Sequence, residues 1–238
     1  MSGGIEVAER FLVGSYWGSR PETVGDCASR LSSCLRGLAA VDEAFSSWFA
    51  KGKSKKSAGV PAAIDQTSLE RLLARGANRN GGDDEEIPEL GFNAALWNAR
   101  RDSASWSTTC GAKPASRTLM NSFVLNLPAV GSEDGIRLHR PAVLREILQV
   151  IVEAWRPDWA SLTNYAISSA QSATPGRPIL GPLTYLRGPV DEPLMTVAGK
   201  KVSVEDMVEG VFIAVAEDPL SVDIPDLVHV AAQVLTNA

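Results

Sequence analysis

Histidine is the side chain that most often serves as a general base near neutral pH, and the sequence has two, His139 and His229. His139 precedes Arg140 and Pro141, where we expect a helix to begin, and His229 lies between two valines in the last expected helix. Neither histidine belongs to the His-Glu-x-x-His pattern of zinc proteases. We therefore expect both to have structural or surface roles.

The three cysteines, Cys27, Cys34 and Cys110, do not have the paired spacing of a zinc site with thiolate ligands. Their odd number, without the spacing of a disulfide framework, indicates reduced thiols. Cys27 and Cys34 lie seven residues apart in an expected helix. Both therefore fall on one helix face, where we expect small buried side chains. The sequence predicts no metal ion and no other cofactor.

Other patterns of catalytic sites are absent or incomplete. The sequence has no Gly-x-Ser-x-Gly, no Gly-x-Gly-x-x-Gly and no Walker phosphate loop. Pro157-Asp158 could open the Pro-Asp…Asp/Glu-x-Lys signature of metal-dependent nucleases, which needs two carboxylates and a lysine beside the attacking water. No lysine follows an acidic residue by two positions, so the second half of that signature is missing. The sequence therefore predicts that the protein is not an enzyme.

Two segments carry dense charge of one sign. Asp83, Asp84, Glu85 and Glu86 form the longest run of carboxylates in the chain. This run could imitate phosphates and sit in a cationic groove of a partner, or it could be a solvated loop. The basic segment 51–56 has no interleaved aromatic residues, so we expect a solvated surface loop there and no nucleic-acid site.

The bulk composition is that of a globular protein. Of the 238 residues, 45% are hydrophobic and 21% are charged, and the formal net charge is −5. That charge argues against general binding of nucleic acid, which needs a basic surface, and it is compatible with a basic partner. We see no secretion signal and no apolar run of membrane-spanning length, so we expect a cytoplasmic protein with no membrane partner.

Hydrophobic periodicity predicts a mixture of helices and strands. Two strong amphipathic helices are expected, one opened by Pro21 and reaching Val41, and one running from Pro141 to Pro157. The other expected elements are helices at 65–74 and 224–235, a loop at 76–88, and strands at 11–17, 90–98, 103–109, 119–127, 159–167, 183–186 and 211–216. This order predicts a single α+β domain spanning residues 1–238, with helices packed on a mostly antiparallel mixed sheet.

Four aromatic residues, Tyr16, Trp17, Trp48 and Trp97, lie in apolar segments. Aromatic side chains are common in interface hot spots and equally in hydrophobic cores. Because their neighbours are apolar, we expect all four in the core.

Several short blocks of the sequence resemble, in order and spacing, a known family: immunity protein family 52 of bacterial polymorphic-toxin and type VI secretion systems. The blocks are Ser15-Tyr16-Trp17-Gly18 with Arg20, Cys27-Ala28-x-Arg30, Trp48-Phe49-x-Lys51-Gly52-x-Ser54, Leu96-Trp97-Asn98, Asn121 to Leu127 with Pro128, and Trp155-x-Pro157-Asp158-Trp159-Ala160. The lysine-rich stretch after Gly52 and the segment 81–86 depart from the family pattern and inherit no role from it.

The resemblance implies an immunity protein that binds and neutralises a toxin with a restriction-endonuclease-like fold. The DNA-binding groove of such a toxin is expected to be basic. The acidic run of Asp83, Asp84, Glu85 and Glu86 is therefore the candidate toxin-binding segment. Direct binding of nucleic acid is not implied. The toxin-binding surface, the mode of inhibition and self-association stay open, as do two other functions: a scaffold or secretion-accessory subunit, and a small-molecule hydrolase.

We expect the purified protein to lack nuclease activity, because the Asp/Glu-x-Lys half of the metal site is missing. Incubation of the protein with plasmid DNA and Mg²⁺ or Mn²⁺ should leave the plasmid intact. Metal-dependent cleavage that disappears in an Asp158→Ala variant would contradict this prediction.

Overall fold

The computed structural model describes residues 9–50, 59–82, 85–113, 120–171, 177–189, 196–197, 200–207 and 209–235. The helices are α1 (Val24–Val41), α2 (Gln66–Arg75), α3 (Glu133–Leu138), α4 (Pro141–Trp155), α5 (Tyr165–Ala170) and α6 (Ile224–Val234). The strands are β1 (Leu12–Trp17), β2 (Trp48–Ala50), β3 (Val60–Ala62), β4 (Phe92–Trp97), β5 (Ser105–Cys110), β6 (Asn121–Asn126), β7 (Trp159–Thr163), β8 (Leu183–Arg187), β9 (Thr196–Val197), β10 (Lys200–Lys201), β11 (Ser203–Met207) and β12 (Gly210–Ala214).

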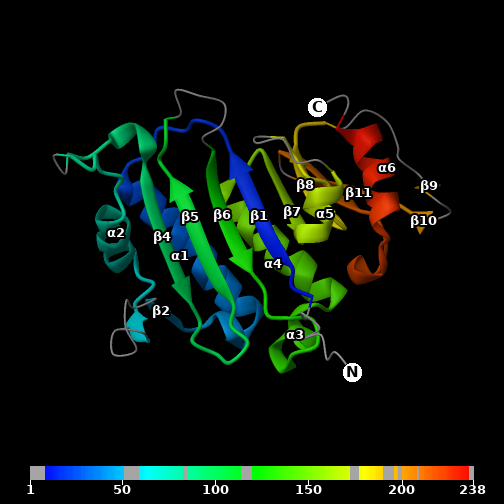
Figure 1. Cartoon of the computed structure of the whole chain (residues 1–238), viewed down its shortest axis with the longest axis horizontal. Helices are drawn as coiled ribbons and strands as arrows, with labels where there is room; N and C mark the ends of the chain where they lie inside the picture. Colours follow the sequence, from blue (N-terminus) through cyan, green and yellow to red (C-terminus); the bar gives the residue numbers. More distant parts are fainter. Residues whose placement is uncertain are drawn as a thin grey trace, which may run out of the picture.

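Ten strands form one sheet in the order β11-β12-β8-β7-β1-β6-β5-β4-β2-β3, and β9 and β10 pair separately. Every pairing between these described strands is antiparallel. Helices α1 and α4 lie on one face of the sheet, whereas α5 and α6 lie on the other face at the β8–β11 end (Figure 1). The predicted α+β class is confirmed.

Helix α1 forms where the sequence predicts it, but it begins later than Pro21. Thr23 accepts a hydrogen bond from the backbone of Asp26, and the Asp26 side chain accepts one from the backbone of Thr23. This capping box satisfies two otherwise unpaired backbone donors, so it sets the first helical residue at Val24. Cys27 and Cys34 are buried on the inner face of α1, as their spacing predicts.

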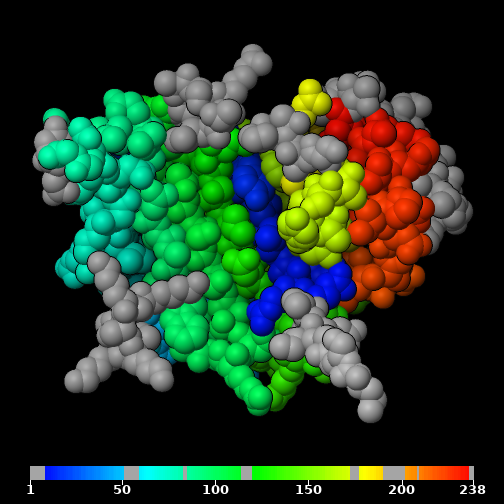
Figure 2. Space-filling model, in the orientation of Figure 1, coloured from blue at the N-terminus to red at the C-terminus, as the bar shows by residue number. Residues whose placement is uncertain are grey.

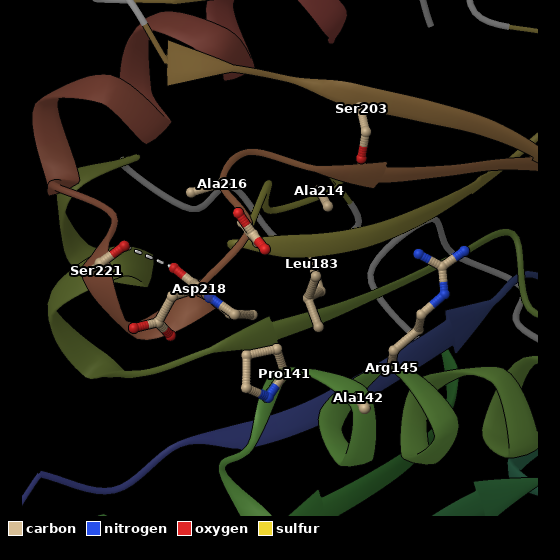
Figure 3. Close-up of a pocket in the computed structure, with 11 residues that line it drawn as sticks. Pro141, Ala142, Arg145, Leu183, Ser203, Ala214, Ala216, Asp218 and Ser221 are labelled. Atoms are coloured by element: carbon tan, nitrogen blue, oxygen red, sulfur yellow. Dashed lines mark hydrogen bonds between the residues drawn. The ribbon is translucent and has the colours of Figure 1, made fainter.

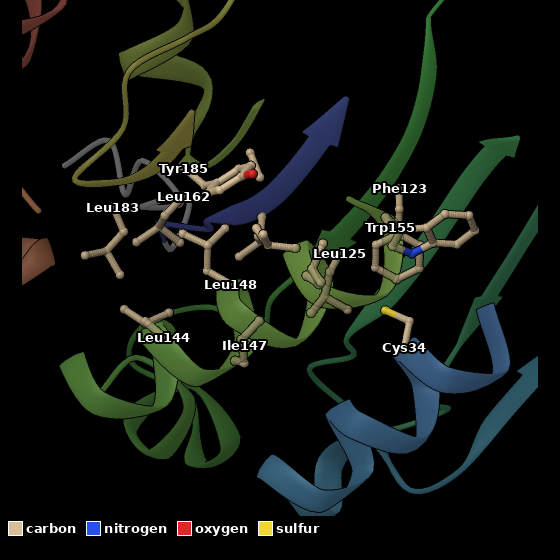
Figure 4. Close-up of a cluster of buried hydrophobic side chains, with 14 of the residues drawn as sticks. Cys34, Phe123, Leu125, Leu144, Ile147, Leu148, Trp155, Leu162, Leu183 and Tyr185 are labelled. Atoms are coloured by element: carbon tan, nitrogen blue, oxygen red, sulfur yellow. The ribbon is translucent and has the colours of Figure 1, made fainter. Parts of the chain in front are cut away.

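Helix α4 begins at Pro141, as predicted, and ends at Trp155, two residues before the predicted stop at Pro157. Arg156 adopts a left-handed conformation, with φ of 45°, and Pro157 follows it, so the helix cannot continue. Its inner stripe packs against β-strand side chains in the core (Figure 4). The buried residues of this stripe are Leu144, Ile147, Leu148, Ile151, Val152 and Trp155.

A series of aromatic rings in contact, stacked except for an edge-to-face contact between Trp106 and Trp48, crosses the core between the sheet and the helices. The ring of Trp155, at the end of α4, lies 5.0 Å from Trp17 of β1 and 5.7 Å from Phe123 of β6. The series continues from Phe123 to Trp106 at 6.0 Å and from Trp106 to Trp48 at 6.3 Å. Trp17 and Trp48 are therefore core residues, as predicted, and their packing joins α4 to four strands of the sheet.

Tyr16 and Trp97 differ from the core prediction. Side chains alternate between the two faces of a strand. Tyr16 therefore points away from the face of the buried Trp17 that follows it, and Trp97 points away from the face of the buried Leu96 that precedes it. Both are only half-buried. They belong to the open face, defined here as the side of β4, β5, β6 and β1 that carries no helix (Figures 1 and 2). None of the twelve residues on the open face is charged. They are Asn93, Ala95, Trp97, Ser105, Ser107, Thr109, Ser122, Val124, Asn126, Leu12, Gly14 and Tyr16.

The predicted strand at 159–167 is wrong in its second half. Strand β7 ends at Thr163, and the Asn164 side chain accepts a hydrogen bond from the backbone of Ile167, which caps α5. Several elements were not predicted at all: α3, β2, β3, β9, β10 and β11. These are short, and β11 and β3 are largely exposed edge strands, so neither has a strong hydrophobic period.

We expect Trp17→Ala to lower the free energy of unfolding by about 3–5 kcal/mol, because it deletes a fully packed ring. Chemical denaturation measures this loss. Trp97→Ala is the matched control, since its half-exposed ring on the open face should cost less. Equal losses in the two variants would show that the Trp17–Trp155 stack contributes no more to stability than the half-exposed ring of Trp97.

Asp42, after α1, forms an ion pair with Arg137 of α3 through two hydrogen bonds of 2.6 and 2.9 Å. Partial burial raises the pKa of the Asp42 carboxyl, but hydrogen bonds from Arg137 and from the backbone of Ala44 outweigh it and hold the pKa below its ordinary value. A lowered folded-state pKa stabilises the fold above the unfolded pKa of about 3.9, and this stability is lost as the pH falls through the folded pKa.

Asp42→Asn should therefore destabilise the protein near pH 7, by about 1 kcal/mol because partly exposed Arg137 is screened by solvent. The difference in free energy of unfolding between the variant and the unsubstituted protein should become smaller near pH 2, about two units below the unfolded pKa. Urea denaturation at both pH values measures it, with Glu146→Gln on the exposed side of α4 as the control. A loss of the same size at both pH values would show that Asp42 acts through packing alone.

Candidate functional site

Four of the sequence blocks that resemble the immunity family, those with Trp17, Arg30, Asn121 and Trp155, meet where β1 and α4 end. Trp17 and Trp155 stack there, and the guanidinium of Arg20 lies 5.0 Å from the centre of the Trp17 ring. Arg20 also donates a hydrogen bond of 2.9 Å to the carbonyl of Trp155. A single arginine thus covers the aromatic stack and satisfies one carbonyl that the end of the helix leaves unpaired.

Other block residues tie together the backbone around this stack. The Gly18 amide donates to the Asp158 carboxylate at 2.8 Å, and the Asn121 side chain donates to the Gly18 carbonyl at 2.7 Å. Arg30 of α1 donates to the carbonyl of Ala154 at 3.1 Å. These polar groups are used in internal hydrogen bonds, so the cluster holds the ends of β1 and α4 in place.

Electrostatics support this structural role. Glu22, whose side chain is only 6% exposed, pairs with Arg30 at 2.6 Å and with Arg20 at 3.1 Å. Burial lowers the pKa of Arg20, and Glu22 opposes that shift. Two arginines thus share one buried carboxylate, and each of them also donates to a carbonyl near the end of α4.

The two histidines have the roles expected from sequence. His139 is buried, its Nδ1 lies 2.8 Å from the Gly135 carbonyl, and its ring meets the edge of Phe11. Burial lowers the pKa of His139, so its ring is neutral near pH 7. His229 lies on α6, where its Nε2 is 3.0 Å from the amide nitrogen of Gln233.

The three cysteines are part of the core. All three are buried and free. Burial raises the pKa of Cys34 to about 12, and the neighbouring thiol of Cys27, together with burial, raises the pKa of Cys110. The thiols of Cys34 and Cys110 therefore stay protonated at neutral pH, and all three side chains pack as apolar groups. Within the described segments, no group of three or more His, Cys, Asp or Glu side chains could hold a metal ion.

The structure describes half of the predicted acidic segment. Asp83 and Asp84 lie outside the described residues, whereas Glu85 and Glu86 are exposed. Arg79 and Glu86 form an isolated antiparallel bridge, and their side chains form an ion pair at 2.5 Å. The charge of Glu86 is thus already compensated within the protein. The described residues on either side of residues 83–84, namely 78–82 and 85–87, lie beside the start of β4, because the Asn78 amide donates to the carbonyl of Gly91 just before that strand.

A long hollow on the other half of the molecule was not predicted. Four cavities of about 560, 740, 510 and 270 Å³ follow one another in this order, since each shares at least one lining residue with the next: Pro141, Arg145 and Glu153. We call this hollow the groove. It lies between α4 on one side and β8, β12 and β11 on the other, and Figure 3 shows Ala142 and Arg145 facing Ser203 across its largest part.

The groove is acidic. Its lining residues include six carboxylates and three arginines, so acidic side chains outnumber basic ones by three: Glu153, Glu205, Asp206, Glu209, Glu217 and Asp218 against Arg140, Arg145 and Arg156. The sequence carried only a weak signal for this site, the two adjacent acidic pairs Glu205-Asp206 and Glu217-Asp218, and such pairs are common on solvated surfaces.

The fold and this site define an α+β protein whose sequence blocks maintain the core and whose hollowed surface lies elsewhere. The chain belongs to the Immunity protein 52 family, whose model matches residues 9–238. No curated protein matches the sequence. Among solved structures, the chain is similar to the Pseudomonas aeruginosa T6SS protein PA0821, with a TM-score of 0.52 and 9% identity, over 95% of this chain and 73% of that one. At this identity the likeness shows a shared fold.

None of the helices in the described segments is sufficiently long and apolar to cross a membrane. The family suggests a protein that is not an enzyme and that binds a cognate toxin.

Proposed function

We propose that this protein neutralises a cognate toxin by binding it, and that the toxin is a nuclease with a restriction-endonuclease-like fold. Membership of the Immunity protein 52 family over residues 9–238 is the observation that carries the proposal. The fold shared with a T6SS protein supports a role in type VI secretion. The single domain of residues 1–238 and its cytoplasmic location are parts of the same proposal.

Inhibition of this kind needs no chemistry from the immunity protein. A nuclease must hold a polyanion, so its substrate-binding surface carries lysine and arginine. A net charge of −5 favours encounter with such a surface, and binding there excludes DNA. The buried thiols and the neutral His139 agree with a role in which the protein binds and does not catalyse.

Co-expression tests this function. Cells that make the toxin encoded beside this gene should survive only when this protein is also made. A catalytically inactive form of the toxin should co-purify with it, because binding does not depend on cleavage. Survival without a stable complex would instead favour an indirect role such as a hydrolase acting on a toxic product, and co-purification without protection would favour a scaffold or secretion-accessory subunit.

The acidic segment of Asp83, Asp84, Glu85 and Glu86 remains our candidate for steering the toxin toward the protein. Because Arg79 compensates Glu86, we expect a modest effect. Replacing the four acids with Ser or Asn should slow association by about twofold to fivefold at low salt, and the difference should vanish at high salt. Stopped-flow mixing measures both rates. Unchanged association at low salt would remove the segment from the toxin-binding surface.

A further inference from the structure

The groove has the length of a short peptide segment. Its cavities are lined by Pro141 at the start of α4 and by Arg156 just after its end. Fifteen residues of helix rise by about 22 Å, at about 1.5 Å per residue. An extended chain covers that distance with about seven residues, at about 3.3 Å each. The groove therefore fits a strand or an extended loop of a partner.

The floor of the groove is apolar. Strand register pairs Phe212 with Tyr185 and with Glu205, and Ala214 with Leu183, so these side chains share the sheet face that α4 covers only in part. Phe212, Tyr185 and Leu183 are almost fully buried, whereas the carboxylates stand at the rim. An occupant would thus place apolar side-chain stems on the floor and charged groups at the rim.

Two of the three arginines of the groove already pair with carboxylates, and the third, Arg140, donates to the carbonyl of Arg137. Arg145 makes two hydrogen bonds to Glu205, and its guanidinium lies 4.5 Å from the centre of the Phe212 ring. Arg156 pairs with Glu209 at 3.6 Å. These pairs leave a surplus of negative charge on the rim.

That surplus is carried by carboxylates without a basic partner. Within the described part of the chain, no arginine or lysine forms an ion pair with Glu153, Glu217 or Asp218. Glu153 accepts one hydrogen bond from Gln149, and Asp218 accepts one from the backbone of Leu220. Their charges are available to a cation from outside.

We propose that the groove binds an extended segment of the cognate toxin that is rich in lysine and arginine. The long side chains of these residues suit an apolar floor with an acidic rim, because their stems are apolar and their ends are cationic. A second copy of this chain is a poorer occupant, since two chains of net charge −5 repel each other. This proposal rests on the proposed function and adds the surface through which that function is performed.

Charge reversal at the rim tests the proposal. Glu153→Lys with Glu217→Lys changes two exposed residues outside the core. The matched control is Glu70→Lys with Glu89→Lys, which makes the same change in charge at the α2–β4 end of the molecule, away from the groove. Two probes are used with each protein: the catalytically inactive toxin encoded beside this gene, and a synthetic peptide of seven lysines.

We expect the groove variant to bind both probes about tenfold more weakly, while the control variant changes affinity by about twofold or less. Circular dichroism and denaturation verify that both variants fold. Ala142→Trp adds a second variant that narrows the groove without changing its charge, and it should weaken binding of the toxin as well.

Hydrogen–deuterium exchange of the complex identifies the surface without mutation. Toxin binding should slow exchange in β11 and in residues 216–221. Protection confined to the open face of β4, β5 and β6, or equal affinities of the groove and control variants, would overturn the proposal while the immunity function stands. A dimeric unsubstituted protein with a monomeric groove variant would also overturn the proposal, because a second copy of the chain would then be the occupant of the groove. If the unsubstituted protein does not bind the toxin, the proposed function fails. Binding of the lysine peptide then still tests whether the groove accepts a cationic segment.

Discussion

The stack between Trp17 and Trp155 is the interaction on which the arrangement of this protein depends. It joins the central strand of a ten-stranded sheet to the last residue of the helix that crosses it. Arg20 covers the stack and ties down the carbonyl of Trp155, so the end of α4 has a defined position above β1. Because α4 also forms one wall of the groove, the geometry of that surface follows from this contact.

The residues that identify the family and the surfaces suited to recognition are largely separate. The blocks around Trp17, Trp48 and Trp155 serve the core, whereas the acidic rim of the groove, represented by Glu153 and Glu217, lies outside them. A change at the rim leaves the aromatic core intact. One fold can therefore present different charges to different partners, which is how an immunity protein could follow changes in its toxin.

Elements with a long buried face were predictable from the sequence. The stripe of α4 and the alternation in β1 and β6 have clear periods, because one side of each packs in the core. Strand β11 was not predictable, since exposed Glu205 and Asp206 give it no apolar alternation and its pairing with β12 supplies its order. The groove was missed for a related reason: α4, β11 and the segment 216–221 contribute to it separately, and only tertiary packing brings them together.

The central place of β1 has a consequence for synthesis of the chain. Leu12 pairs with Asn126 and with Thr163, so β1 leaves the ribosome before its partners, which are translated more than about 100 residues later. At about 5–20 residues per second, that delay is on the order of ten seconds. During it, an apolar strand with Val13 and Trp17 stays without its sheet neighbours. The nascent chain is therefore a natural substrate for chaperones, and its final collapse should be a late, largely concerted event.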